Sequence, residues 1–206
     1  LVNDQIHTIV ISGGTGVGKS YVLRQCLEKW QIPYRLIPVY IDTSQLQESI
    51  DFEASLAQGK MVMASGLLGD TSNRCWVVDD AHVLSPEVRH TLLVEAKLRQ
   101  ILLIMTVNHE DGTLDDAEWE LVDVHVSMDA PTLQSKVKVL QRMRDEIEPS
   151  SEDILSLIDP KRVQSIFVSD AMLSLAISYA LQARTVGHDA EYVLLQVMKS
   201  LAVLDG

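Results

Sequence analysis

The chain has few basic side chains and few cysteines for its 206 residues. It carries 17 Lys and Arg against 29 Asp and Glu, which gives a formal net charge of −12. Such a field repels phosphate backbones and anionic headgroups, so it argues against broad nucleic-acid binding and against an anionic membrane as partner. The two cysteines, Cys26 and Cys75, are too few for a disulfide framework.

Long apolar runs, internal repeats and low-complexity stretches are also lacking. No segment approaches the roughly 20 apolar residues of a membrane span, and the first residues show no signal-peptide pattern. We therefore expect no membrane partner and a cytoplasmic location. The six histidines and two cysteines show no CxxC, HxxxH or HExxH spacing, which argues against a transition-metal site. The chain opens at Leu1, close to a predicted strand, so we leave open that it is a fragment or a trimmed product.

Short apolar runs alternate with helical patterns through the first 129 residues. With 47% hydrophobic residues, the composition is that of a globular protein with a full core. Uninterrupted apolar strands between helices favour a parallel sheet that is covered on both faces. We predict strands at 6–11, 34–41, 74–78 and 101–107 and helices at 20–30, 52–56 and 85–97.

The strand signal disappears after Val126. We predict helices at 131–148, 150–158, 170–184 and 188–204. The fold class expected from the whole pattern is α/β, a parallel sheet flanked by helices and followed by a small all-α domain, with the boundary near Asp129 and Pro131.

A phosphate-binding loop lies between the first predicted strand and helix, and it matches GxxxxGK[ST]. Its candidate ligand-binding residues are Gly13, Gly14, Thr15, Gly16, Val17, Gly18, Lys19 and Ser20, with Tyr21 next in the helix. Backbone N–H groups of such a loop cradle phosphate oxygens, the lysine reaches the β- and γ-phosphates, and the serine ligates Mg²⁺. The motif therefore predicts ATP and Mg²⁺ as ligands, and it explains how an acidic protein can hold an anion.

Polar residues follow two of the predicted strands. Asp79 comes directly after strand 74–78 and is the candidate ligand for Mg²⁺, and Asp80 stands where a carboxylate polarises the attacking water. P-loop ATPases usually place glutamate there, which is one methylene longer. Asn108 follows strand 101–107 and is the candidate sensor of the γ-phosphate. The candidate catalytic residues are thus Lys19, Asp80 and Asn108, while simple strand-ending turns remain the alternative for the aspartates and the asparagine.

Together these residues resemble the AAA+ ATPases, and within them the ATPase subunits of magnesium chelatase, of which the chain looks like a divergent member. Three further stretches carry the resemblance. Asp51-Phe52-Glu53 with Leu56, Gly59 and Gly66-Leu67-Leu68 is similar to the family's DxExxL…G…PGLL, 103–112 to its LVGTMNPEEG, and 187–191 to its GHRAE.

The departures concern arginines. In the family's GELRPQLLDRF, one of two arginines enters the neighbouring subunit's ATP, and here Asp115 and Leu121 stand at their places, as Asp189 does for the arginine of GHRAE. An arginine finger is worth about 10³ to 10⁵ in rate, so we expect a homomeric ring to hydrolyse ATP poorly. Seven carboxylates lie between Glu110 and Asp123, either as a solvated face or as a device for choosing a partner. Alternative sources of the missing charge are Arg89, Arg99, Arg144, Lys161, Arg162 and Arg184.

The resemblance implies a nucleotide-binding α/β domain at 1–129 and a helical lid at 130–206, with Mg·ATP bound between them. It also implies a homo- or hetero-oligomeric ring whose ATPase drives a von Willebrand A-type protein or the larger, metal-inserting chelatase subunit. The other interpretation is a nucleotide-binding regulatory or scaffold subunit that hardly hydrolyses ATP. It follows from the lost arginines and from Asp80 in place of glutamate.

Overall fold

The computed structural model describes residues 5–46, 49–50, 52–61, 63–64, 66–69, 74–144, 165–182 and 189–205. The chain divides into two compact units, one of residues 7–129 and one of residues 1–6 with 130–206. Their assignment as a nucleotide-binding domain and a lid stays a prediction. The predicted helix at 150–158 lies outside the described residues.

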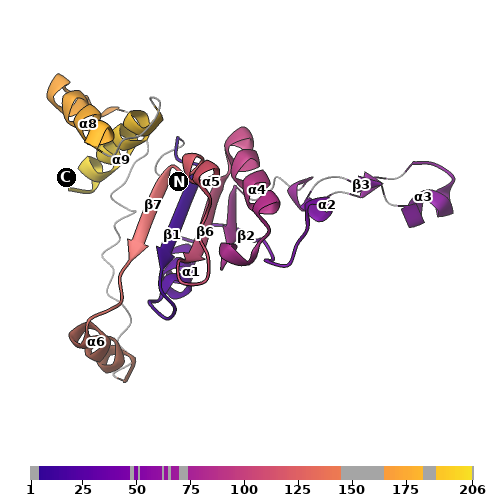
Figure 1. Ribbon diagram of the computed structural model, residues 1–206, viewed down its shortest axis with the longest axis horizontal. Helices are drawn as coiled ribbons and strands as arrows, with labels where there is room; N and C mark the ends of the chain where they lie inside the picture. Colours follow the sequence, from indigo (N-terminus) through magenta and orange to yellow (C-terminus); the bar gives the residue numbers. More distant parts are fainter. Residues whose placement is uncertain are drawn as a thin grey trace. The chain divides into compact units, whose positions relative to one another are not determined.

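A five-stranded parallel sheet forms the centre of the first unit, in the order β2-β5-β6-β1-β7 (Figure 1). The strands are β1 (Thr8–Gly13), β2 (Arg35–Leu36), β5 (Cys75–Val78), β6 (Leu102–Asn108) and β7 (Val124–Met128), and a separate antiparallel pair is formed by β3 (Ser49–Ile50) and β4 (Met63–Ala64). The predicted α/β fold class with a parallel sheet is therefore confirmed.

Helices connect the strands of the first unit, and helices are also the regular elements described in the second unit. The first unit has α1 (Lys19–Lys29), α2 (Thr43–Leu46), α3 (Phe52–Gln58), η1 (Leu67–Gly69), η2 (Ala81–Val83), α4 (Pro86–Arg99) and α5 (Asp116–Glu120). The second has α6 (Leu133–Arg144), α8 (Asp170–Gln182) and α9 (Asp189–Asp205). None of the helices in the described part of the chain is long and apolar enough to cross a membrane.

Both faces of the parallel sheet are covered. Neighbouring residues of a strand point to opposite sides, so each strand supplies apolar side chains to the core on either face. Trp76 and Val78 of β5 lie in one core cluster, together with Leu92 and Leu93 of α4. Val77, the residue between them, belongs to a second cluster that includes Leu23 and Leu27 of α1. The alternation explains why the strands of the sequence are apolar throughout.

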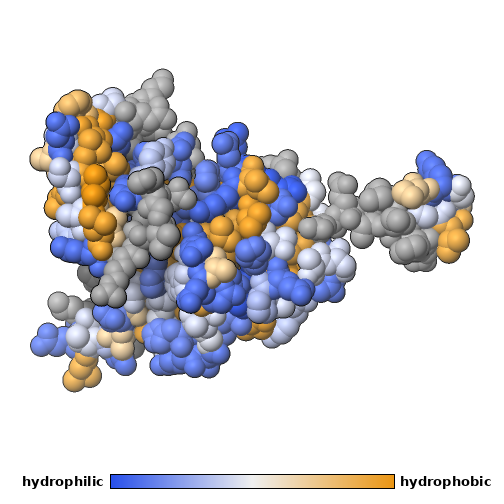
Figure 2. Space-filling view, turned by 45° about the horizontal axis from the view of Figure 1, so that its top comes forward, coloured by the Kyte–Doolittle hydropathy of each residue, from blue (hydrophilic) through white to orange (hydrophobic). Residues whose placement is uncertain are grey.

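Two strands of the parallel sheet differ most from the sequence prediction, and the short pair β3 and β4 was not predicted either. Only Arg35 and Leu36 of the expected strand 34–41 pair with β5. β7 was not predicted, because its central residues are exposed and include a histidine and a serine, as befits an edge strand that pairs with β1 alone among the described strands. In the second unit, α8 carries exposed apolar side chains, Leu175, Ile177 and Leu181 among them. Apolar surface, in orange, is visible on the left of Figure 2.

The acidic stretch at 110–123 is largely built into the first unit. Asp115 is the N-cap of α5, and it forms a capping box with Glu118. The Glu118 side chain is only 1% exposed and accepts two hydrogen bonds from Arg89, of 2.8 and 3.1 Å. Asp123 accepts from the backbone N–H groups of His7 and Thr8 and pairs with Lys97 of α4 at 2.9 Å. A purely solvated acidic face is therefore wrong for these side chains.

These contacts also bear on the missing arginine finger. Arg89 is buried against Glu118, and Arg99 pairs with Glu95 at 2.7 Å and donates to the Leu68 carbonyl, so both guanidinium groups are engaged within their own unit. Lys161, Arg162 and Arg184 lie outside the described residues.

Replacing Glu118 by glutamine tests the buried ion pair. Removing one charge leaves Arg89 buried without its partner, so we expect Glu118→Gln to lower the free energy of unfolding by about 3 to 5 kcal/mol. Glu120→Gln is the matched control, because Glu120 lies exposed in the same helix and the change should stay within about 0.5 kcal/mol. Urea titrations followed by circular dichroism measure both, and equal losses would contradict the role of the pair.

Candidate functional site

The predicted phosphate-binding loop joins the end of β1 to the start of α1. Gly16 and Gly18 have φ of 76° and 100°, a left-handed conformation that favours glycine. A Cβ on Gly13 would lie 2.6 Å from the backbone oxygen of Met128, so β7 approaches too closely for any side chain there. α1 begins after Gly18 with no side-chain cap, and the N–H groups of its first turn are thereby left for a ligand.

Lys19 folds back over this loop. Its Nζ donates to the carbonyl oxygens of Gly13 at 2.9 Å and Gly14 at 2.8 Å, and the residue is buried. These bonds hold the ammonium group at the loop, and phosphate oxygens are the acceptors that could replace the carbonyls.

A hydroxyl and a carboxylate from different elements meet beside the loop. Ser20 Oγ donates to Asp79 Oδ1 at 2.7 Å, and the hydroxyl of Thr106 on β6 donates to the same oxygen at 2.7 Å. Thr106 Oγ1 in turn accepts from the backbone N–H of Asp80 at 2.8 Å. Thr106 thus links β6 to both aspartates that follow β5.

Asp80 adopts a left-handed backbone conformation, with φ of 63° and ψ of 49°, as it opens the turn η2. Such a conformation is uncommon for a residue other than glycine, although aspartate tolerates it better than most. It lies exposed at the mouth of the cavity described below.

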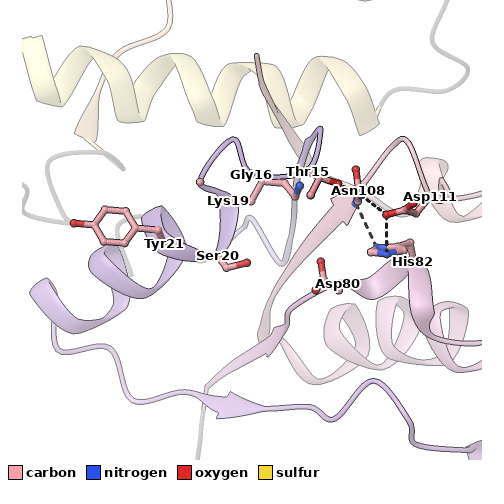
Figure 3. A pocket seen from close by; sticks show the side chains of 10 residues that line it. Thr15, Gly16, Lys19, Ser20, Tyr21, Asp80, His82, Asn108 and Asp111 are labelled. Atoms are coloured by element: carbon pink, nitrogen blue, oxygen red, sulfur yellow. Dashed lines mark hydrogen bonds and ion pairs between the residues drawn. The ribbon is translucent and has the colours of Figure 1, made fainter. Parts of the chain in front are cut away.

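Asn108 is the centre of a second network, at the end of β6. Its Nδ2 donates to Thr15 Oγ1 at 2.8 Å and to the Asp111 carboxylate, and its backbone N–H donates to Nδ1 of His82 at 3.4 Å. Figure 3 shows Asn108, Asp111 and His82 grouped on one side of the loop. The residue is buried, so the network fixes the position of its amide.

A cavity of about 390 Å³ opens between these groups, a size in the range of small-ligand sites. Its described lining residues are Thr15, Gly16, Gly18, Lys19, Ser20, Tyr21, Asp80, His82, Asn108 and Asp111. Most of the site residues predicted from the sequence therefore meet at one place. Asp79 reaches the cavity through Ser20, and Tyr21 is 61% exposed at its edge. Gly13, Gly14 and Val17 belong to the loop but not to the lining.

Sequence reasoning missed four residues of this site: Thr106, His82, Glu110 and Asp111. Thr106 could have been found, because it is a lone hydroxyl in an otherwise apolar strand, two residues before Asn108. The other three lie in turns after the strands, where the sequence pattern does not fix the direction of a side chain.

The donor set suits a magnesium–phosphate ligand. Among the described residues, no group of three or more His, Cys, Asp and Glu side chains could hold a metal ion by itself. Mg²⁺ is usually bound by one or two carboxylates together with phosphate oxygens and waters, and the Ser20–Asp79 pair provides this kind of oxygen ligand.

Comparison with solved structures identifies the fold. The chain is similar to a predicted ATPase from Cytophaga hutchinsonii ATCC 33406, with a TM-score of 0.65 and 12% identity over 99% of this chain and 73% of that one. The chain has an AAA-like α/β fold. It is also similar to a chain in a model of the BchI–BchD complex of magnesium chelatase, based on a single-particle cryo-EM reconstruction, with a TM-score of 0.54 and 17% identity over 89% of this chain and 66% of that one.

No family model matches the chain. At identities of 12% and 17% the structural likeness shows the AAA+ fold alone, so membership of the magnesium chelatase family stays a prediction. Asp51, Gly187 and His188, which carry part of that resemblance, lie outside the described residues.

The bonds of Thr106 can be tested by removing its hydroxyl. Thr106→Val keeps the shape of the side chain but leaves the Asp80 N–H and the Asp79 carboxylate each without one partner, so we expect the free energy of unfolding to fall by about 1 to 3 kcal/mol. Thr106→Ser retains the hydroxyl and should restore most of the loss. If a chemical denaturation series gave valine and serine equal stability, the hydroxyl would have no such role.

Proposed function

We propose that this chain is a Mg·ATP-binding AAA+ module, similar to the ATPase subunits of magnesium chelatase, which couples ATP binding and hydrolysis to a metal-insertion or remodelling partner. The observation that carries the proposal is the meeting of Lys19, Ser20, Asp80 and Asn108 around one cavity at the end of the parallel sheet. The AAA+ fold supports it independently.

Each residue has a role that its position supports. The loop from Gly13 to Gly18 and the first turn of α1 would bind phosphate oxygens through backbone N–H groups, and Lys19 would exchange its carbonyl acceptors for phosphate. Ser20 and Asp79 would hold Mg²⁺, which neutralises phosphate charge when it is bound.

The remaining polar groups would act on the reacting end of the nucleotide. Asp80 would accept a hydrogen bond from the attacking water, and Asn108, held by Thr15 and Asp111, would donate its amide N–H to the terminal phosphate. Tyr21 follows the loop at the rim of the cavity, and its ring points away from the other lining side chains (Figure 3), so its backbone would be the part that contacts a bound nucleotide.

A second candidate function is a nucleotide-binding regulatory subunit that hydrolyses ATP poorly. It is favoured by the segment where the family carries its arginines. Asp115 caps α5 and Leu121 ends that helix against the core, so neither residue offers the positive charge of an arginine to a neighbouring subunit. A partner subunit would then provide the arginine, and a von Willebrand A-type protein or a chelatase large subunit are the partners we propose.

Removal of the lysine tests the site assignment. Charged hydrogen bonds to phosphate are lost in Lys19→Ala, so we expect its affinity for Mg·ATP to fall by about 10- to 100-fold. Lys29→Ala, an exposed lysine at the far end of the same helix, should bind as the unmodified chain does. Isothermal titration calorimetry measures both, and unchanged affinity in Lys19→Ala would refute the proposed site.

Phosphate release across a range of protein concentrations separates the two candidate functions. Turnover that rises more than linearly with concentration and is lost in Lys19→Ala indicates a self-assembling ATPase. Turnover at the level of Lys19→Ala, together with retained ATP binding in the unmodified chain, indicates the regulatory subunit, because an absent arginine finger lowers the rate by about 10³ to 10⁵.

A further inference from the structure

A carboxylate lies directly against the phosphate-binding loop. Glu110, in the loop between β6 and α5, accepts a hydrogen bond from the backbone N–H of Thr15 through Oε2 at 3.2 Å. Its other oxygen faces Gly14, since a Cβ built on this glycine would lie 3.0 Å from Glu110 Oε1. An acidic side chain therefore uses an N–H of the loop that is proposed to bind an anion.

The surrounding network holds Glu110 in this place. Its backbone N–H donates to Asn108 Oδ1 at 3.3 Å, and Asn108 Nδ2 donates to Thr15 Oγ1 at 2.8 Å. Two polar groups of Thr15 are thus engaged by residues at and after the end of β6, its N–H by Glu110 and its hydroxyl by Asn108. The contact between Glu110 and Thr15 is therefore part of a hydrogen-bonded cluster of three residues.

The charge balance around the cavity is unfavourable for a long polyphosphate. Lys19 is the only lysine or arginine among the described residues that line it, whereas Asp80 and Asp111 are both part of the lining. Glu110 and Asp79 add two more carboxylates within one hydrogen bond of lining residues, although Asp79 is also paired with Arg24 at 3.5 Å. Like charges at such distances repel, and each further phosphate adds negative charge near them.

The carboxylates should repel mainly the terminal phosphate of a bound nucleotide. In loops of this sequence the lysine reaches the β- and γ-phosphates. Asn108, from which Glu110 is only two residues away, is on the side of the loop proposed for the terminal phosphate. The β-phosphate, by contrast, would bind to N–H groups later in the loop and at the start of α1, whereas the hydrogen bond that Glu110 accepts comes from Thr15.

We propose that Glu110 is a specificity-determining residue of this site. Its carboxylate competes with a terminal phosphate for the Thr15 N–H and repels that phosphate, so the site holds a nucleoside diphosphate more tightly than the triphosphate. This inference rests on the proposed function, because it assumes that the loop binds a nucleotide.

Separate calorimetric titrations with ADP and with ATP, each with and without Mg²⁺, test the proposal. The unmodified chain should bind ADP more tightly than ATP when Mg²⁺ is left out. Glu110→Gln removes the charge and keeps an acceptor for Thr15, so the affinity for ATP should rise by about fivefold while that for ADP stays within about twofold. Glu110→Ala should shift the preference in the same direction, and the shift should shrink in 0.5 M salt, since exposed charges are screened there.

Glu120→Gln is the control, because it removes the same charge from an exposed position in α5. An equal rise in ATP affinity in this variant would assign the effect to net charge and overturn the role of Glu110. An unchanged ratio of ATP to ADP affinity in Glu110→Gln would also overturn it, while nucleotide binding by the unmodified chain would leave the proposed function standing. Failure of the unmodified chain to bind either nucleotide would refute both.

Discussion

The parallel pairing of β1, β5 and β6 determines where the polar groups of this molecule meet. Gly13 and Asn108 are direct partners across the β1–β6 pair, and Val78 pairs with Met105, which places Asp79 beside Thr106. Strands that run in the same direction end at the same edge of a sheet, and ligands of open α/β sheets bind at that edge. The residues at the ends of these strands depend on this register, because a strand shifted by one residue turns its side chains to the opposite face.

The carboxylates near the site of this acidic chain are stabilised by basic residues that the fold brings beside them, and not by an excess of basic residues in the sequence. The segment 100–135 has no lysine or arginine, yet α4 supplies Arg89 to Glu118 and Lys97 to Asp123 from outside it. Backbone N–H groups donate to two further carboxylates of this segment, Asp115 and Glu110, and such bonds are charge-assisted. These ion pairs and charge-assisted hydrogen bonds of the first unit therefore form only when the chain folds, and they are lost when it unfolds.

The sequence was sufficient for the features that depend on local pattern. Apolar β5 and β6, the loop from Gly13 to Ser20 and the start of α4 at Pro86 are all recognisable, because each follows from residue type and spacing. β7 was missed because an edge strand with exposed side chains has no apolar signal. The contacts of Glu110 and Thr106 were out of reach for another reason. They join segments that lie far apart in the chain, and their geometry exists only after the sheet has formed.

The double use of Glu118, in the capping box of α5 and in the buried pair with Arg89, limits how this lineage can change. Arginine at position 115 would place a finger where the AAA+ relatives are expected to carry one, but it would remove the cap on which α5 depends. A substitution at position 115 therefore breaks the capping box and lowers the stability of α5, whatever charge the new side chain brings.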